Sequence, residues 1–251
     1  MITKNKIKFL NSLLYSKYRN RHKKFIVEGV RAFEELLQSK HNIDKIFTTN
    51  IFLDKYPKSS IIKSNFDYKV ITEVDLKKIQ QTTNSQGIIA VVPIKKCNNI
   101  SKVINGNILI LDSISEPGNM GTLLRSAVWF GIKNIFLSNG CVDIYNPKVV
   151  RSAMGAHFYL SNFFQSDILD IVSKIKNSGH TLLAATLDGT SHQKISVESK
   201  KWALILGSEA YGIDKSILNQ IDIKISIPQK GSLESLNVAV AGSILLDRLS
   251  I

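Results

Sequence analysis

The strand-to-helix junction from Ile225 to Gly242 reads ISIPQKGSLESLNVAVAG. Its β-branched start predicts a buried strand, and Pro228 ends that strand because proline cannot donate to a β-ladder. After a polar loop, apolar residues recur at helical spacing, at Val238, Ala241, Gly242, Leu245 and Leu249. Ser235 and Asn237 therefore stand where free backbone N–H groups suit a polar ligand. A plain loop whose serine and asparagine cap the helix is the alternative.

Strand and helix patterns alternate before this junction. The expected strands are residues 107–111, 135–137, 181–187, 202–206 and 224–227. The expected helices are residues 121–130, 148–155, 168–176 and 215–219, and one more after residue 237. This order predicts an α/β fold with a parallel sheet covered on both faces. Ligands of such sheets bind beyond the carboxyl ends of the strands.

The first part of the chain predicts a smaller α/β module. A helical pattern over residues 1–24 precedes expected strands at 25–27, 43–48, 69–71 and 88–92 and a helix at 30–38. The polar stretch KKCNNISKVING, residues 95–106, reads as a linker. We therefore expect a domain at 1–94, a linker at 95–106 and a second domain at 107–251.

The charge is concentrated in the first module. Residues 1–106 hold 20 Lys and Arg against 8 Asp and Glu, whereas residues 107–251 hold 13 against 12. This asymmetry favours a module that meets a polyanion, RNA or DNA above all. Its expected phosphate contacts are Lys4, Lys6, Lys8, Lys17, Arg19 and Arg21. A lysine-rich composition with a solvated helix face is the alternative.

The sequence gives no support for several other classes of protein. The chain has no apolar run long enough to cross a membrane and no apolar segment near residue 1 typical of a signal peptide. It has no GxGxxG after a strand, no P-loop and no HExxH or GxSxG pattern. Cys97 and Cys141 form no metal-ligand pattern, and a disulfide between them stays open. We expect a cytoplasmic protein without a metal site.

Three stretches follow strands and form a set. They are EPGNMGTLLR (116–125), GSEAYG (207–212), and IP (227–228) with SLNV (235–238). Together they resemble the SpoU/TrmH family of RNA 2′-O-ribose methyltransferases, in the SPOUT class, although many members have Asp where this chain has Glu116. A weaker match is NPKVVRSAMGA (146–156). FIVEGVR (25–31) and QGIIAVV (86–92) are similar to the family's substrate-binding domain.

The resemblance implies S-adenosylmethionine as the methyl donor and a deep trefoil knot in the C-terminal domain. It also implies a homodimer whose interface lies beside the cofactor. By analogy, the main chain at Gly207, Ile227 and Leu236, with the neighbouring Leu206 and Pro228, holds the cofactor. A glycine there would let the backbone approach a flat ring closely.

The resemblance also assigns roles to charged residues. Methylation of a ribose 2′-hydroxyl needs an in-line sulfonium, an oriented oxygen and a route for its proton. In the family, the arginine matching Arg125 is proposed to help deprotonate the hydroxyl. Because a guanidinium stays protonated, we instead expect Arg125 to clamp a phosphate and stabilise negative charge on the oxygen. A surface ion pair with Glu116 or Glu209 is the alternative.

Other side chains have two interpretations each. Glu209 would orient Arg125 or Ser235, or would satisfy a helix N-terminus. Asn119 and Asn237 would fix the loops, or would serve in a turn or cap. Ser235 would contact the substrate or relay its proton, or would cap the helix.

Three further residues complete these expectations. Arg151 would contact RNA phosphate or form a dimer contact. Trp129 and Trp202 are expected in the core, because both lie in apolar patterns.

The sequence thus favours an S-adenosylmethionine-dependent RNA 2′-O-methyltransferase that acts on ribosomal RNA. Ribosomal RNA is preferred because the first module looks like those of the family's ribosomal members. Transfer RNA as the substrate, a base as the methylated group and a non-catalytic RNA-binding protein on the same fold are the alternatives.

Overall fold

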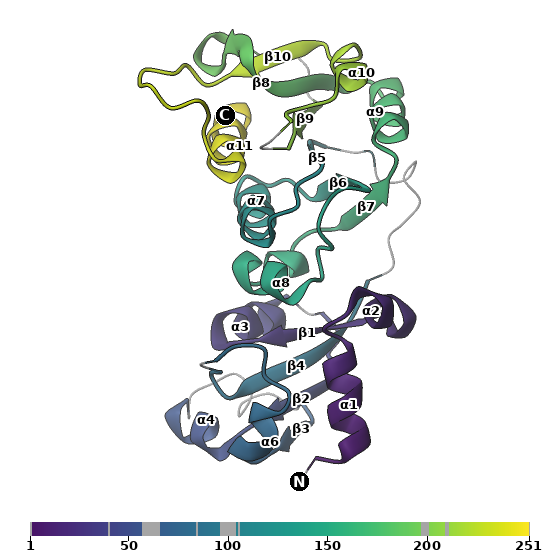
Figure 1. Ribbon diagram of the computed structural model, residues 1–251, viewed down its shortest axis with the longest axis vertical. Helices are drawn as coiled ribbons and strands as arrows, with labels where there is room; N and C mark the ends of the chain where they lie inside the picture. The colour runs from purple at the N-terminus through teal and green to yellow at the C-terminus, as the bar shows by residue number, and fades with distance from the viewer. Residues whose placement is uncertain are drawn as a thin grey trace. The chain divides into compact units, whose positions relative to one another are not determined.

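The computed structural model describes residues 2–39, 41–56, 66–83, 85–95, 104, 106–196, 201–208 and 211–250. The chain forms two compact units, and Figure 1 labels their elements. Unit 1 comprises Met1–Lys96 and Asp143–Phe158, and unit 2 comprises Cys97–Val142 and Tyr159–Ile251. The chain therefore passes from one unit to the other after Lys96, after Val142 and after Phe158. The first crossing lies in the expected linker; the sequence patterns indicated neither of the other two.

Unit 1 is built on a four-stranded mixed sheet. Its strands, in spatial order, are β1 (Lys24–Glu28), β4 (Ile88–Pro93), β2 (Lys45–Thr48) and β3 (Tyr68–Val70). β4 runs antiparallel to both β1 and β2, and β3 runs parallel to β2. All four strands were predicted, with bounds that differ by one or two residues.

Alternate residues of these strands bury opposite faces of the sheet. Ile88 and Ala90 of β4 pack with α3 (Val30–Gln38) and α4 (Asn50–Lys55). Ile89 and Val91 pack on the other face, with α1 (Lys4–Ser12) and α6 (Glu73–Lys77). The expected helical stretch over residues 1–24 is two helices, α1 and α2 (Ser16–His22). The segment 143–158 adds α8 (Pro147–Ala153) and the short η2 (Ala156–Phe158) to unit 1.

Unit 2 contains a six-stranded, wholly parallel sheet, which confirms the predicted α/β class. Its strands, in spatial order, are β10 (Ile223–Ser226), β8 (Thr181–Ser191), β9 (Trp202–Leu206), β5 (Ile108–Leu111), β6 (Asn134–Ser138) and β7 (Asn162–Ser166). Every neighbouring pair is parallel. β7 was not predicted. β8 is longer than expected, and its register against β10 shifts between Lys224 and Ile225.

Helices cover both faces of the unit 2 sheet. α9 (Ile168–Asn177) and α10 (Lys215–Leu218) pack on one face, and η3 (His192–Lys194) follows β8. α7 (Pro117–Trp129) and α11 (Val238–Leu249) lie side by side (Figure 1), with α11 against β9. Trp202 is buried as expected, and its Nε1 donates to the Leu249 carbonyl at 3.1 Å. The core prediction for Trp129 is wrong: this side chain ends α7 and is 84% exposed.

Within the described ranges, no helix combines the length and apolar character needed to span a membrane.

Candidate active site

The predicted site residues stand in three loops that follow β5, β9 and β10 at the carboxyl ends of these strands. The first two loops begin side by side, because β5 pairs with β9 and the Asp112 N–H donates to the Leu206 carbonyl at 2.9 Å. The third loop leaves β10 and returns to start α11, as Figure 1 shows. This is the edge at which open parallel sheets bind ligands.

The first loop is shaped by the start of α7. Glu116 is the N-cap residue, and its carboxylate accepts a hydrogen bond from the Asn119 N–H at 2.5 Å. Pro117 occupies the first helical turn, where a missing N–H costs nothing. A Cβ on Gly118 would lie 2.8 Å from Glu116 Oε2, so a glycine leaves room for the capping carboxylate. The acidic-Pro-Gly turn is therefore a helix start, for which Glu serves in place of Asp.

Asn237 joins the third loop to the first. Its Oδ1 accepts from the Ala239 and Val240 N–H groups at 3.0 and 3.3 Å, which caps α11. Since the cap fixes Oδ1, the amide NH₂ points away from α11 and donates to Asn119 Oδ1 at 2.9 Å. Asn237 is therefore a cap and also a link between the two loops. Ser235 is not the cap, so that alternative is excluded for it.

Two further contacts set the spacing of α7 and α11. A Cβ on Gly242 would lie 2.6 Å from both Leu123 Cδ2 and Leu206 Cδ1, so glycine lets α11 approach α7 and β9 closely. The hydroxyls of Ser126 and Ser243 lie 2.7 Å apart. The two helices are thus tied near their starts by the asparagine pair and farther along by the serine pair.

Arg125 and Ser235 are both exposed beside this junction. Within the described part of the chain, no carboxylate forms an ion pair with Arg125, and the Ser235 hydroxyl makes no hydrogen bond. Glu116 instead serves as the α7 cap. Glu209 lies outside the described residues.

The second loop turns back on itself. The Gly212 N–H donates to the Ser208 carbonyl at 2.8 Å, and a Cβ on Gly207 would lie 2.4 Å from Gly212 O. Residue 207 is therefore glycine because the loop's own backbone fills the space. The expected reason, approach to a bound ring, is not needed to explain it.

Cys141 lies buried near the end of β5. Its thiol donates to the Leu111 carbonyl at 3.2 Å, and burial raises its pKa. It is therefore held as a neutral core residue. Cys97 lies outside the described residues.

Two family models match the chain. The model of the SpoU rRNA Methylase family matches residues 106–247, more than half of the sequence. The chain belongs to this SpoU family. The model of the MRM3-like substrate binding domain matches residues 4–90. The first match includes the segment 143–158, although that segment packs in unit 1.

Several relatives match this SpoU-family chain along nearly its whole length. The Bacillus subtilis 23S rRNA (guanosine(2553)-2′-O)-methyltransferase RlmP is 31% identical, over 97% of this chain and 95% of the relative. A structure from Porphyromonas gingivalis, assigned to the TrmH family of RNA methyltransferases, is 33% identical with a TM-score of 0.85. The match covers 99% of this chain and 98% of that one. A crystal structure of an RNA 2′-O ribose methyltransferase is 26% identical with a TM-score of 0.83, over 98% and 95% of the chains.

The residues expected to hold the cofactor in this SpoU-family chain differ in exposure. Leu206 is buried in β9, Gly207 and Ile227 are half-buried, Pro228 is exposed and Leu236 is 46% exposed. Together they offer apolar side chains and main-chain polar groups but no charged side chain. This set fits the adenine ring and the apolar carbon chain of S-adenosylmethionine, with main-chain groups that can bond the adenine nitrogens. Within the described ranges, no cluster of three His, Cys, Asp or Glu residues is placed to bind a metal.

The residues expected to bind RNA differ in exposure. Lys4, Lys8, Lys17 and Arg21 are exposed on α1 and α2, and Lys6 is half-buried, with its Nζ 5.0 Å from the Phe9 ring centre. The expectation for Arg19 is wrong. This side chain is 2% exposed and bonds within unit 1, so it is not available to a phosphate. Arg151 is half-buried on α8.

Proposed function

We propose that this protein transfers a methyl group from S-adenosylmethionine to a ribose 2′-hydroxyl of ribosomal RNA. The observation that carries the proposal is the 2.9 Å hydrogen bond from Asn237 to Asn119, because it joins two of the predicted loops beside Arg125. The name of the B. subtilis relative, a 23S rRNA 2′-O-methyltransferase, supports ribose and ribosomal RNA as the targets.

The proposal divides the chemistry between cofactor and protein. When bound, S-adenosylmethionine supplies an electrophilic methyl group. Arg125 stays protonated and donates hydrogen bonds to an RNA phosphate and to the 2′-oxygen as negative charge develops on it. Ser235 Oγ, which is exposed, accepts the hydrogen bond of the 2′-hydroxyl and passes its proton toward water. Asn119 and Asn237 hold the two loops at a fixed separation. Glu209 keeps its predicted role of orienting Arg125 or Ser235.

We also infer that a second copy of the chain covers part of unit 2. Large apolar side chains are exposed there, at Trp129, Leu187, Tyr211 and Leu233. Exposed apolar side chains of this size often mark an interface with another chain. Light scattering after gel filtration should give twice the monomer mass; a monomer at micromolar concentration would contradict the homodimer. Residues 1–94 as the RNA-binding domain, the cytoplasmic location and the trefoil knot also stay predictions.

A transfer assay tests the proposed function. Purified protein and methyl-labelled S-adenosylmethionine are incubated with ribosomal or transfer RNA from a strain that lacks the gene, and the RNA is digested to nucleosides. We expect label in a 2′-O-methyl nucleoside of ribosomal RNA. Label in a methylated base would overturn the reaction class, and label in transfer RNA alone would overturn the substrate. If calorimetry detects no cofactor binding, the whole proposal fails.

A further inference from the structure

The segment Asp143–Phe158, here called the arm, connects two neighbouring strands of unit 2 but packs in unit 1. β6 and β7 are parallel partners, with Asn134 opposite Asn162, and the arm lies in the crossover between them. A crossover helix normally covers its own sheet. In the arm, Val150 and Phe158 instead join the core of unit 1 beside Phe25 of β1. This unusual docking needs its own stabilising contacts.

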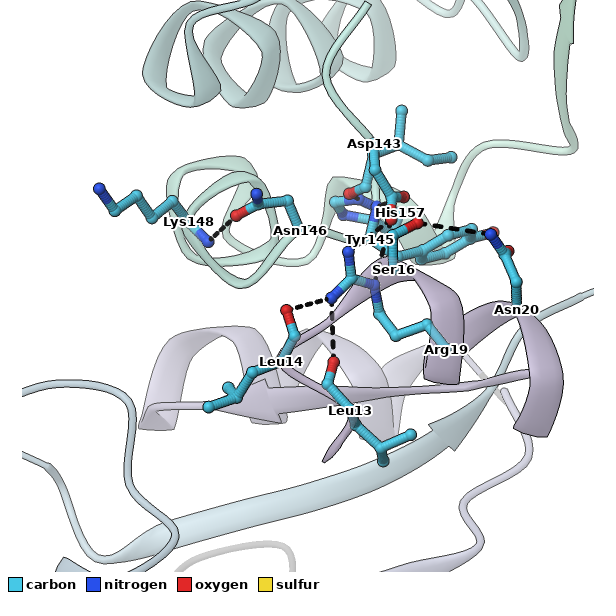
Figure 2. Close-up of polar contacts among 11 residues, drawn as sticks. Leu13, Leu14, Ser16, Arg19, Asn20, Asp143, Tyr145, Asn146, Lys148 and His157 are labelled. Carbon is cyan, nitrogen blue, oxygen red and sulfur yellow. Dashed lines mark hydrogen bonds and ion pairs between the residues drawn. The ribbon is translucent and has the colours of Figure 1, made fainter. Parts of the chain in front are cut away.

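Arg19 of α2 provides the main polar contact at the start of the arm. Figure 2 shows its guanidinium between Asp143 and the end of α1. Its Nε and Nη2 donate to Asp143 Oδ2 at 3.1 and 2.5 Å, and its Nη1 donates to the Leu13 and Leu14 carbonyls at 2.9 and 2.7 Å. The Arg19 side chain is 3% exposed, and that of Asp143 is 29% exposed. The pair is therefore shielded from salt far better than a surface ion pair.

Asp143 connects Arg19 with the rest of the arm. Its second oxygen, Oδ1, accepts from the Tyr145 N–H at 2.9 Å, and the Tyr145 ring centre lies 4.8 Å from that of Phe25. His157, near the far end of the arm, bonds back to the Ile144 carbonyl at 2.7 Å. Asn146 then caps α8 through the Lys148 N–H, as Figure 2 also shows. Arg19 therefore holds Asp143, the first residue of the arm.

The region around the end of α8 also contacts the rest of unit 1. A Cβ on Gly155 would lie 2.4 Å from Glu35 Cβ of α3, and Gly155 has φ +93°, so only glycine fits this approach. Arg151 Nη1 donates to Gln81 Oε1 at 3.4 Å, and the Gln81 N–H donates to the buried Glu28 carboxylate at 2.8 Å. The direction of Arg151 therefore depends on the docking of the arm.

We propose that Arg19 and Asp143 are positioning residues for RNA methylation, which act by holding the arm on unit 1 so that Arg151 meets RNA phosphate. This proposal rests on the proposed function and deepens it. Arg19 lies among basic residues of α2 that face solvent, yet it serves RNA binding without touching RNA. The arm lies in sequence between β6 and β7 of unit 2.

Two pairs of matched variants test the proposal. Asp143→Asn keeps an oxygen for the Tyr145 N–H but removes the charge that Arg19 needs; Asp44→Asn removes the same charge from the more exposed Lys24–Asp44 pair of unit 1. Arg19→Gln and Lys17→Gln each remove one positive charge from α2. The readouts are hydrogen exchange of residues 143–158 in the free protein, RNA affinity against salt, and KM and kcat for RNA.

The expected results separate positioning from direct contact. Asp143→Asn should speed exchange in the arm and raise the KM for RNA roughly tenfold with kcat unchanged, although it makes the protein more positive. Arg19→Gln should do the same. Because Arg151 then no longer meets the phosphate, both variants should also lower the salt slope by about one, whereas Lys17→Gln should lower that slope by about one without affecting exchange in the arm. The double variant Arg19→Gln/Asp143→Asn should match the worse single variant.

Other outcomes would overturn the proposal. If Asp143→Asn behaves like Asp44→Asn, the ion pair does not position the arm. If Arg19→Gln weakens RNA binding and lowers the salt slope while exchange in the arm keeps the wild-type rate, as expected for Lys17→Gln, Arg19 contacts RNA directly. Should Arg19→Gln fail to fold, Asp143→Asn still decides, because its side chain is the more exposed partner. Hydrogen exchange needs no RNA, so loss of arm protection with an inactive wild-type protein would point to a failure of the proposed function alone.

Discussion

Replacing Asn237 by aspartate separates its two contacts, the cap of α11 and the link to Asn119. An aspartate can accept from the Ala239 and Val240 N–H groups as Asn237 Oδ1 does, but it has no NH₂ to donate to Asn119. Asp and Asn are equally good caps, and a negative charge at a helix start adds about 0.3–1 kcal/mol. Asn237→Asp gains this charge but loses the hydrogen bond to Asn119, which contributes about 1 kcal/mol, so it should unfold at the wild-type urea concentration or slightly below it. Asn237→Ala, which has neither cap nor link, should lose about 2 kcal/mol.

The two variants should rank in the reverse order for activity: the more stable Asn237→Asp should be the less active. A neutral hydrogen bond contributes about 1 kcal/mol net, so its loss should lower the single-turnover rate about fivefold in Asn237→Ala. The loss should be larger in Asn237→Asp, because the new carboxylate faces Asn119 Oδ1 unless the Asn119 amide turns over. Asp167→Asn is the matched control: it makes the reverse exchange at the α9 cap, which also accepts two N–H groups. A stable Asn237→Asp protein with the wild-type rate would show that the hydrogen bond to Asn119 does not serve methyl transfer.

Four further predictions concern other parts of the chain. Arg125→Ala should abolish methylation but change the calorimetric affinity for S-adenosylmethionine by no more than a few-fold; a collapse of cofactor binding would make Arg125 structural. Gly242→Ala should destabilise the protein by about 1 kcal/mol in urea unfolding. The overpacking against Leu123 and Leu206 costs about 1–3 kcal/mol, which outweighs the gain of about 1 kcal/mol from the higher helix propensity of alanine. Unchanged stability would mean that these two leucines move aside easily. Burial lowers the pKa of His157 to about 4, below its unfolded value near 6.5. The unfolded chain therefore takes up the proton first, and the free energy of unfolding should fall by up to about 3 kcal/mol as the pH drops from 6.5 to 4. His157→Gln should flatten this part of the pH profile of stability, and an unaltered profile would count against the assignment to His157. Reversing Lys4 and Lys8, which are exposed on α1, should weaken RNA binding and reduce its salt slope, whereas an unchanged slope would mean that both are merely solvated.

The sequence was most informative where a local pattern matches a local structure. The run Trp202–Leu206 is a buried strand with the predicted bounds, because five consecutive apolar residues suit a strand covered on both faces. The junction after β10 was also readable, since the polar loop and the helical spacing place Asn237 at the start of α11. The sequence left open whether Asn237 fixes the loops or caps the helix, and the structure shows that one amide makes both contacts.

Long-range contacts account for the wrong predictions. Arg19 looks like its basic neighbours on α2, but its partner Asp143 is 124 residues away, and no helical periodicity can reveal such a pair. The docking of the arm in unit 1 depends on the same contact and on the close approach of Gly155 to Glu35. Trp129 continues an apolar pattern along α7, yet the helix ends at this residue and the side chain faces outward. For Arg19 and the arm, the deciding fact is which distant element packs against the residue; for Trp129 it is the exposed end of α7.

The most direct test of the central claim is a map of 2′-O-methyl groups along the ribosomal RNA of three strains. One strain lacks the gene, one carries it restored, and one carries the Arg125→Ala variant. We expect that one ribose methyl group is absent from the deletion strain, returns with the wild-type gene and stays absent with Arg125→Ala. An unchanged ribosomal map in the deletion strain, or full restoration by Arg125→Ala, would contradict it.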